Sequence, residues 1–441
     1  MSADGAAPRR RVVIVGGGFG GLAAARRLRH AEDVDVTVID RKHHHLFQPL
    51  LYQVAAGAVA EGECAVPIRA SLRRIPNARV LMAEVVDVDV ERREVQLDRG
   101  ERVGYDTLII ACGMETSYFG HDEWADVTCG LKTLADAVEL RGRLYGALEQ
   151  AERTEDPEER AEWLTFAIVG GGPTGVEVAG ALALLMRRKL AGEYGRFGAG
   201  DARVILLDAG DRVLSPFSES LSARAAGALT EIGVTVREQV RATAIDSRGV
   251  TIEKNGTSER FKARTVVWAA GVRPVPLVAT VAGATGAETD RAGRVKVQPD
   301  LTLPGHPEIS VIGDVANLDG PGGKPLPGLA TVAIQQAAHV AKGIREGGAG
   351  ASTPFRYLDK GALAVIGRGH AICEIRGLKL HGWPAFATYL MVHLYYLGGE
   401  GKRLKIVTDW VTTFFGSLGN QVIEGDLSTV ERAPPKVEAA G

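Results

Sequence analysis

One pattern occurs twice in this chain and restricts the folds open to it. At residues 11–21 and again at residues 166–175, a short run of β-branched and apolar residues leads into glycines spaced as GxGxxG. Each glycine run is followed by an Ala- and Leu-rich stretch typical of a helix, and then by a second apolar run that ends in an aspartate. A strand, a glycine turn and a helix in this order form the unit that binds a dinucleotide. We therefore predict an α/β protein with two Rossmann-like dinucleotide-binding domains.

The first glycine run contains Gly16, Gly18 and Gly21, and each glycine has its own task in such a turn. The first allows the tight turn, the second lets the backbone approach a pyrophosphate, and the third lets the helix pack on the strand. Asp40 lies 19 residues beyond Gly21, at a strand end where a carboxylate can accept hydrogen bonds from a ribose. A purely structural glycine turn is the alternative, but the strand, the helix and the acid together favour a nucleotide site.

The second glycine run contains Gly170, Gly172 and Gly175, and its candidate ribose partner is Asp208. The gap of 33 residues from Gly175 to Asp208 needs an extended helix or an insertion. A carboxylate at this strand end repels a 2′-phosphate, so the sequence favours NADH over NADPH. Arg212 lies close by in the sequence and could serve a phosphate, which leaves NADPH open.

A third strand end carries an acid of its own. Residues 308–312 form a short apolar run that ends in Gly313 and Asp314. A carboxylate at this place can hold the ribityl hydroxyls of a flavin, although Gly-Asp after a strand is also common in turns. Two further apolar runs, at 108–113 and 266–271, end in a glycine turn and repeat one pattern in the two halves of the chain.

Composition excludes several classes of protein. The 441 residues carry a net charge of −2, with 52 basic and 54 acidic residues, which argues against nucleic acid as a partner. The four cysteines are too far apart for a CxxC redox centre or a clustered zinc site, so we expect mostly buried, reduced thiols and a cytosolic setting. The three consecutive histidines at 43–45 do not converge on one ion, so no metal is expected. No apolar run reaches the roughly 20 residues that a spanning helix needs.

Three separate strings resemble those of one protein family. They are His45–Val54, Gly172–Glu177, and Phe355–Gly361 with the Ala364–Arg368 segment that follows. Considered alone, the first string predicts an apolar loop packed near a flavin. Over residues 10–350 the chain resembles the two-dinucleotide-binding flavoprotein superfamily. Over nearly its full length it resembles type II NADH dehydrogenases, the single-subunit NADH:quinone oxidoreductases.

This resemblance implies FAD in the first nucleotide site and NADH in the second. It implies that hydride passes from NADH to the flavin and that two electrons then pass to a quinone, without proton pumping. Glu177, which we expect in the first turn of its helix, and Gln335, which we expect beside the flavin ring, are the implied catalytic residues. The alternative is that the Glu177 carboxylate only stabilises its helix, through its interaction with the positive end of the helix dipole.

The implied quinone-binding residues are Thr331, Gln335 and Lys360. Thr331 stands where the family has the first glutamine of an Ala-Gln-x-Ala-x-Gln run, and the shorter side chain puts its contact with a quinone headgroup in doubt. Lys360 matches a lysine near the acceptor pocket, and a plain surface lysine is the alternative.

The motifs and the resemblance together give two sets of expected cofactor-binding residues. The FAD set is Gly16, Gly18, Phe19, Gly20, Gly21, Asp40, Val85, Ala111, Gly113, Gly313, Asp314, Ala330 and Thr331. The NADH set is Gly170, Gly172, Pro173, Thr174, Gly175, Glu177, Asp208, Ala270 and Gly271.

The same reasoning divides the chain into parts. We expect an FAD-binding domain at 10–115 and 290–350, an NADH-binding domain at 160–285, a charged connection at 150–162, and a C-terminal module at 355–425. Residues 383–397 are almost entirely apolar, with aromatic residues suited to the headgroup zone of a bilayer. The resemblance favours an amphipathic module that attaches peripherally to the cytoplasmic side of the cell membrane, in a homodimer. A core or dimer-interface helix is the alternative.

Two other functions are compatible with the motifs. A flavin-dependent NAD(P)H reductase with a non-quinone acceptor would fit the departure at Thr331. A non-enzymatic FAD- and NADH-binding redox sensor would keep both nucleotide sites and turn over slowly.

Overall fold

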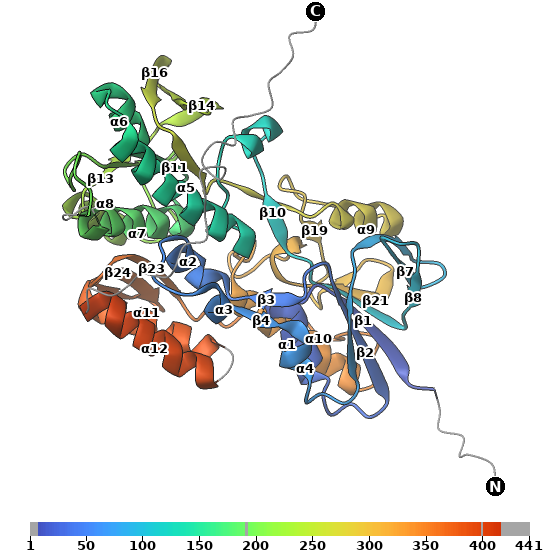
Figure 1. Ribbon diagram of the computed structural model, residues 1–441. Helices are drawn as coiled ribbons and strands as arrows, with labels where there is room; N and C mark the ends of the chain where they lie inside the picture. The colour runs from blue at the N-terminus through green and yellow to red at the C-terminus, as the bar shows by residue number, and fades with distance from the viewer. Residues whose placement is uncertain (1–7, 190–192, 398–399, 416–441) are drawn as a thin grey trace, which may run out of the picture. The chain divides into compact units, whose positions relative to one another are not determined.

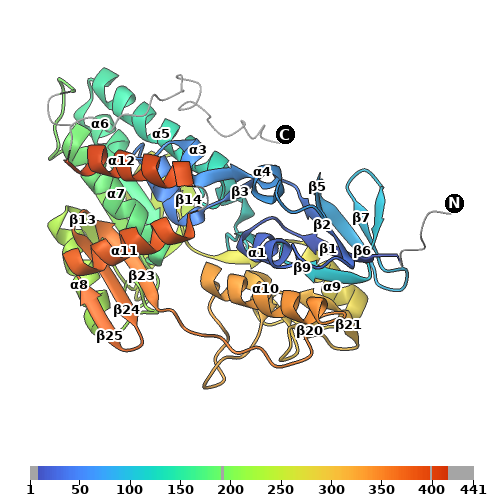
Figure 2. The ribbon, with the colours of Figure 1, turned by 90° about the horizontal axis from the view of Figure 1, so that it is seen from below.

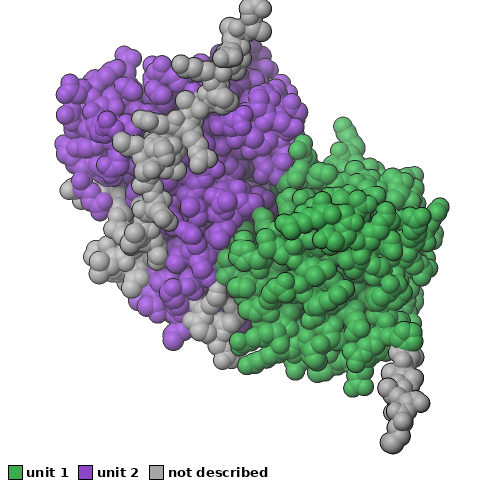
Figure 3. All heavy atoms as spheres, turned by 45° about the vertical axis from the view of Figure 1, so that its right-hand side comes forward, with its two compact units in different colours: residues 1–46, 65–115, 272–358 green, residues 47–64, 116–271, 359–441 purple. Residues whose placement is uncertain are grey.

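The computed structural model describes residues 8–189, 193–397 and 400–415. The sequence predicts a disordered lead-in at residues 2–10 and a loose tail at residues 424–441. Residues 2–7 and the tail lie outside the described residues, whereas Arg10 already belongs to a strand. The chain forms two compact units, coloured separately in Figure 3. Unit 1 contains residues 1–46, 65–115 and 272–358, and unit 2 contains residues 47–64, 116–271 and 359–441.

Unit 1 is built on a six-stranded sheet in the order β20-β21-β9-β1-β2-β5, whose strands are labelled in Figure 2. Its strands are β1 (Arg10–Val15), β2 (Val34–Asp40), β5 (Ala78–Met82), β9 (Thr107–Ile110), β20 (Thr302–Leu303) and β21 (His306–Val311). All neighbours are parallel except β20, which pairs antiparallel with β21. In the middle of the sheet, β1 has Val12, Val13, Ile14 and Val15 buried on both faces, as expected for a parallel strand covered on both sides.

One face of this sheet is covered by helices from both ends of unit 1. They are α1 (Phe19–Arg27), α4 (Ile68–Leu72) and α10 (Ala330–Arg345). Helices α1 and α10 lie against each other although some 300 residues separate them in the sequence (Figures 1 and 2). Leu22, Leu28, Val340 and Ile344 pack in one core there. The segment after residue 290 is therefore part of the core around the first glycine turn.

The opposite face of the sheet is covered by a small antiparallel sheet and a helix. The elements are β6 (Val85–Asp89), β7 (Glu94–Leu97), β8 (Arg102–Gly104) and α9 (Leu277–Thr285), and they share a core with β1, β9 and β21. The remaining elements of this part of the chain are β3 (His44–Leu46), β4 (Ala65–Pro67), β10 (Met114–Thr116), β18 (Val272–Pro274), β19 (Val295–Lys296), β22 (Ala316–Asn317) and the 3-10 turn η3 (Gly313–Val315).

Unit 2 is built on a four-stranded parallel sheet in the order β13-β12-β11-β17. The strands are β11 (Thr165–Val169), β12 (Arg203–Leu207), β13 (Val234–Arg237) and β17 (Thr265–Trp268). Helices α7 (Pro173–Lys189) and α8 (Glu219–Glu231) pack on these strands. An antiparallel sheet of β14 (Arg241–Asp246), β15 (Gly249–Lys254) and β16 (Thr257–Lys262) shares a second core with β11 and β17. The predicted α/β class is confirmed.

The C-terminal segment packs directly on the helices of unit 2. Strands β23 (Ala362–Gly367), β24 (His370–Ile375) and β25 (Leu378–His381) form an antiparallel sheet against α7 and α8. Gly180 in the middle of α7 has no side chain because a Cβ there would overlap the Ile366 carbonyl oxygen of β23. Helix α11 (Trp383–Tyr396) lies on this sheet, and α12 (Glu400–Phe415) follows.

Two segments differ from the sequence-based expectation. Residues 47–54, expected as a loop, form a 3-10 turn η1 (Gln48–Leu50) and the start of a short helix α2 (Leu51–Ala55), which is followed by α3 (Glu61–Cys64). Most of the charged connection at 150–162 is helical rather than irregular: α5 (Leu134–Arg153) and α6 (Pro157–Trp163) occupy it, and η2 (Asp122–Asp126) precedes them.

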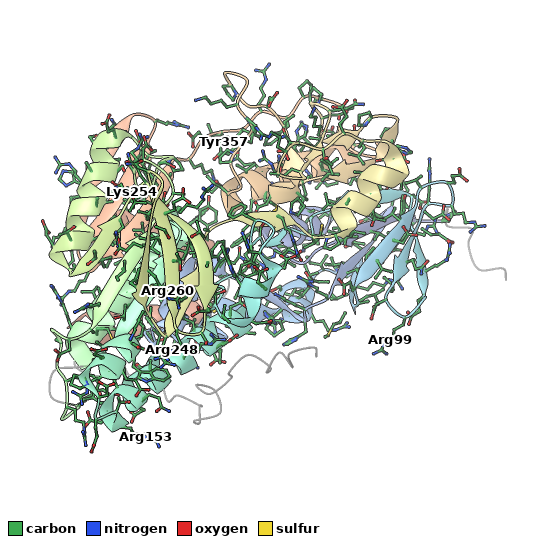
Figure 4. The ribbon with its side chains drawn as sticks, turned by 90° about the horizontal axis from the view of Figure 1, so that it is seen from above. Arg99, Arg153, Arg248, Lys254, Arg260 and Tyr357 are labelled. Carbon is green, nitrogen blue, oxygen red and sulfur yellow. The ribbon has the colours of Figure 1, made fainter. Side chains whose placement is uncertain are left out.

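The charges of α6 are partly internal rather than solvated. Glu162 is buried and accepts hydrogen bonds from Arg248 and Arg264, with Lys262 close enough for an ion pair. Arg248 and Arg260 are labelled in Figure 4 on the sheet that carries these basic residues. This charged segment is therefore partly a helix, and its Glu162 pairs with basic residues of a neighbouring sheet.

Three of the four cysteines are buried, and none of the four forms a disulfide. Within the described ranges, no helix is both long and apolar enough to cross a membrane.

Candidate functional site

The first glycine turn connects β1 to α1 and leaves one open side. Gly16 has φ +108°, and a Cβ at this residue would overlap the Ala111 carbonyl oxygen. A Cβ at Gly21 would overlap the Gly16 carbonyl oxygen, so both glycines are required by the protein itself. Gly18 differs, because a Cβ there would meet nothing within 4 Å. The absence of a side chain at Gly18 leaves room for a group from outside the protein.

Asp40 stands at the end of β2 and is tied to this turn. Its Oδ2 accepts a hydrogen bond from the Gly17 N–H at 2.6 Å, and its Oδ1 accepts one from the Lys42 N–H at 2.7 Å. These two bonds fix the plane of the carboxylate beside the turn. Each oxygen keeps a second lone pair, with which it can accept a ribose hydroxyl.

Other residues of the predicted FAD set lie at the same edge of the sheet. Ala111 and Gly113 follow β9, which neighbours β1, and Gly313 and Asp314 follow β21, which neighbours β9. Gly20 lies close to Ala111 and Ile312. The carboxyl edge of a parallel sheet is where nucleotides bind in this class of fold. Val85 begins β6 and is buried, two residues beyond Ala83, whose N–H donates to the Asp40 carbonyl oxygen.

Helix α10 begins beside Gly313. Ala330 and Thr331 are its first two residues, and a Cβ at Gly313 would touch Ala333. The Thr331 hydroxyl lies 3.3 Å from the hydroxyl of Tyr357, which is labelled in Figure 4. The Gln335 amide is bonded to Leu358 rather than open: Nε2 donates to the Leu358 carbonyl oxygen and Oε1 accepts from the Leu358 N–H.

The second glycine turn repeats the geometry of the first in unit 2. Gly170 has φ +115° and lies against the Ala269 backbone, and a Cβ at Gly175 would overlap the Gly170 carbonyl oxygen. A Cβ at Gly172 would again meet nothing within 4 Å. Pro173 and Thr174 begin α7. Each turn therefore has two glycines at which a Cβ would overlap the backbone, and one glycine that faces open space.

Asp208 takes the position in unit 2 that Asp40 takes in unit 1. Its Oδ2 accepts a hydrogen bond from the Gly171 N–H, and its Oδ1 accepts one from the Gly210 N–H at 2.6 Å. Ala270 and Gly271 follow β17, the neighbouring strand end. Arg212 donates to the Ser215 carbonyl oxygen at 3.0 Å, so its guanidinium is already bonded to the backbone.

Both turns fit a dinucleotide. In each, an open glycine, a following helix start and an oriented carboxylate lie together at the carboxyl edge of a parallel sheet. Backbone N–H groups at a helix start favour phosphate, and a carboxylate one strand away can bind a ribose. The residues present can therefore hold FAD and NADH.

A small pocket of about 80 Å³ lies in unit 2 and contains Glu177. Its walls are formed by Gln48, Leu51, Tyr52, Leu131, Lys132, Thr174 and Glu177. Glu177 is the fifth residue of α7, so it lies in the second turn, and the expectation of a first-turn position was wrong. The dipole of the helix end therefore acts on it less strongly than expected.

Burial raises the pKa of Glu177 to about 8, and a hydrogen bond from the Val365 N–H works in the opposite direction. The carboxyl is consequently mostly protonated at neutral pH. A group that titrates near the working pH is suited to giving or taking a proton.

The last predicted acceptor residue, Lys360, belongs to unit 2. Its Nζ donates to the Tyr396 hydroxyl at 3.1 Å and lies 5.7 Å from the centre of that ring. Among the residues that the structure describes, no group of three or more His, Cys, Asp and Glu is placed to hold a metal ion.

The sequence did not reveal most of the pocket. Tyr52 and Gln48 lie in a string that the family resemblance singled out, but without an assigned task. Leu131 and Lys132 are some 45 residues from Glu177 and carry no motif. Only the folded chain brings them together.

Comparisons with known proteins place the chain in a family. Residues 10–337 match the family described as pyridine nucleotide-disulphide oxidoreductase. The chain is 43% identical over 421 residues to the type II NADH:quinone oxidoreductase Ndh of Mycobacterium tuberculosis. The alignment covers 94% of this chain and 90% of that relative. It is 44% identical over 413 residues to NdhA of the same organism, and this alignment covers 91% of this chain and 87% of NdhA.

Solved structures share the fold at lower identity. NDH2 from Plasmodium falciparum in complex with NADH has a TM-score of 0.85 at 20% identity and covers 94% of this chain and 100% of that one. The sulfide:quinone oxidoreductase of Aquifex aeolicus has a TM-score of 0.69 at 18% identity, covering 94% and 98%.

Proposed function

Because this chain belongs to the family of type II NADH:quinone oxidoreductases, we propose that it oxidises NADH and reduces a quinone through bound FAD, without pumping protons. The observation that carries the proposal is the pair of matching glycine turns, each with an open glycine and an oriented aspartate. Bound FAD supplies the acceptor for the hydride of NADH and the two-electron donor for the quinone. The residues of the chain bind, orient and supply a proton.

Unit 1 holds FAD in this proposal. The backbone around Gly18 faces the pyrophosphate, Asp40 binds the adenosine ribose, and Asp314 binds the ribityl chain. Gly16, Phe19, Gly20, Gly21, Val85, Ala111, Gly113, Gly313, Ala330 and Thr331 form the remaining wall of the site.

Unit 2 holds NADH. The backbone at Gly172, Pro173 and Thr174 faces its pyrophosphate, and Asp208 binds the adenosine ribose. The negative charge of Asp208 disfavours the 2′-phosphate of NADPH. Arg212 donates to backbone carbonyl oxygens through Nη2 only, so the preference for NADH rests on the charge of Asp208.

Glu177 holds the proton that the reaction consumes. NADH, one proton and a quinone give NAD⁺ and a quinol, so each turnover takes up one proton from outside NADH. The protonated carboxyl of Glu177 at neutral pH is a source for it. We assign the acceptor contacts to Thr331, Gln335 and Lys360. In this arrangement, Thr331 and Tyr357 offer a pair of hydroxyls where better-matching relatives have an amide.

The C-terminal helices attach the protein to the surface of a membrane. Helix α11 exposes Trp383, Ala387, Met391 and Tyr395 at intervals of four residues, which places them on one helix face. Tyr395 is 73% exposed and Met391 65%. Helix α12 exposes Leu404, Val407 and Val411. Apolar helix faces flanked by aromatic residues suit the interface of a bilayer. Attachment to the cytoplasmic side of the cell membrane, as a homodimer, completes the proposal, and both of these features rest on the family.

One experiment tests the reaction. The purified protein should show the visible spectrum of a flavoprotein, lose its visible flavin absorption on anaerobic addition of NADH, and regain it on addition of a menaquinone analogue. Recovery with a soluble dye but with no quinone would favour a non-quinone acceptor. A colourless protein, or one that NADH bleaches but no acceptor restores at a useful rate, would overturn the proposal.

A further inference from the structure

A chain of four hydrogen bonds runs through the interior of unit 2. The Trp410 indole of α12 donates to Gln53 Oε1 at 2.8 Å, and Gln53 Nε2 donates to the Tyr52 hydroxyl at 2.9 Å. The Tyr52 hydroxyl lies 3.2 Å from the Tyr389 hydroxyl of α11, which lies 3.3 Å from the Pro49 carbonyl oxygen. The four side chains are all buried.

The two ends of the chain fix its direction. An indole N–H can only donate and a carbonyl oxygen can only accept. Trp410 therefore sets the Gln53 oxygen toward itself and the Gln53 amide nitrogen toward Tyr52. Tyr52 accepts from Gln53 and gives its one proton to Tyr389, which gives its own to Pro49. With this direction, the indole N–H, both phenol O–H groups and one N–H of Gln53 each have an acceptor, as buried polar groups require.

One member of the chain, Tyr52, also lines the pocket that contains Glu177. We propose that Trp410, Gln53 and Tyr389 are positioning residues, whose hydrogen bonds keep the Tyr52 proton directed away from the pocket and so leave the Glu177 carboxyl without that donor. This inference rests on the proposed function for its catalytic meaning, because Glu177 supplies the proton there. The hydrogen-bond chain itself is independent of that function.

The other titratable groups near the pocket leave this arrangement intact. Burial holds the pKa of Tyr52 and of Tyr389 well above the ordinary value, so both remain neutral over the working range. His393 stacks on Tyr389, and burial lowers its pKa to about 4, so it is neutral as well. Lys132 is the cationic side chain in the pocket wall. Glu177 is thus the group in the pocket that titrates near neutral pH.

Two substitutions release the Tyr52 proton in different ways. Tyr389→Phe removes its acceptor and keeps the ring that stacks on His393. Gln53→Leu removes the donor to Tyr52, so Tyr389 can donate in the reverse direction and Tyr52 can donate into the pocket. In both variants we expect the apparent pKa of Glu177 to fall by about 1 unit, because a hydrogen bond to a carboxylate favours its ionised form.

The measurement is an infrared titration of the flavin-loaded holoenzyme between pH 5 and 10, with the carboxyl band of Glu177 assigned by its loss in Glu177→Gln. Trp124→Phe and Tyr105→Phe are the controls, because they remove a buried indole and a buried phenol that do not belong to the hydrogen-bond chain. In both controls the apparent pKa of Glu177 should stay at the wild-type value.

Trp410→Phe provides a third test. If Trp410 acts only by orienting Gln53, it shifts the Glu177 titration in the wild type and adds nothing in a Gln53→Leu background. An unshifted titration in both Tyr389→Phe and Gln53→Leu, or equal shifts in the controls, would overturn the inference. Quinone reductase activity is recorded on the same samples, so an inactive wild type with the shifts intact counts against the proposed function alone.

Discussion

The side chain of Gln335 and the backbone of Leu358 exchange two hydrogen bonds, each 3.0 Å long. The amide that the family resemblance assigns to the acceptor site is therefore occupied by the chain itself. Gln335 fixes the segment that contains Tyr357, whose hydroxyl lies beside that of Thr331. A contact of Gln335 with the acceptor would have to share the amide with Leu358.

Replacing Gln335 by leucine tests this arrangement. Gln335→Leu removes both bonds, and because the site is exposed we expect a loss of about 1 kcal/mol in the free energy of unfolding. We also expect a several-fold higher KM for the quinone and an unchanged KM for NADH. Lys342→Gln, at an exposed position of the same helix, is the control. An unchanged quinone KM would remove Gln335 from the acceptor site.

The two kinds of glycine in the first turn should behave differently. Gly18→Ala adds a methyl group to open space, so the fold should persist while the affinity for FAD falls, because the methyl group meets the pyrophosphate. Gly21→Ala should instead destabilise the protein, since its Cβ overlaps the Gly16 carbonyl oxygen. Flavin content and thermal unfolding separate the two effects. Gly227→Ala, in open space on α8, is the control. Full flavin binding by Gly18→Ala would place the cofactor elsewhere.

Asp208 should set the preference between the two nicotinamide cofactors. Asp208→Asn keeps an acceptor oxygen but removes the charge that repels a 2′-phosphate. We expect the ratio of kcat/KM for NADH over NADPH to fall about tenfold, which corresponds to about 1.4 kcal/mol. Asp211→Asn changes an exposed acid four residues beyond β12 and should leave the ratio at the wild-type value. An equal ratio in the two variants would assign the preference to another residue.

Glu177 should make the stability of the protein depend on pH. Its pKa is raised to about 8 in the folded chain, so the folded state binds the proton more tightly than the unfolded state does. Stability therefore falls as pH rises from the ordinary glutamate range to about 8, and is constant above it. Glu177→Gln should lack this decline. Chemical denaturation of both holoproteins at pH 5, 7 and 9 measures it, and parallel pH profiles would contradict the assignment.

Membrane attachment should depend on the exposed faces of α11 and α12. Met391→Glu combined with Leu404→Glu places two charges on these faces and should release the protein from anionic vesicles in a sedimentation assay. Val86→Glu introduces a charge at an exposed apolar residue of β6 and should leave binding intact. Deletion of the residues after about 380 should also release the protein. Continued sedimentation of the double variant would place the attachment elsewhere.

The elements of the nucleotide sites could be predicted because they are local. Gly16, Gly21 and Asp40 are constrained by a turn, a close packing contact and a strand end, and each leaves a mark in a short stretch of sequence. Glu177 could be named from the resemblance, but its raised pKa could not, because strand β23 and the pocket wall come from distant segments. The helices at 150–162 were missed because pairing of Glu162 with Arg248 and Arg264 cannot be read from a run of charges.

The partners of α1 also have a consequence for synthesis. Its apolar residues pack on Val340 and Ile344 of α10, which leave the ribosome only after most of the chain has been made. Until then Leu22 and Leu28 lack the surface that covers them. The nascent N-terminal segment should accordingly bind chaperones until residue 345 has emerged, and fragments that end before α10 should aggregate rather than fold.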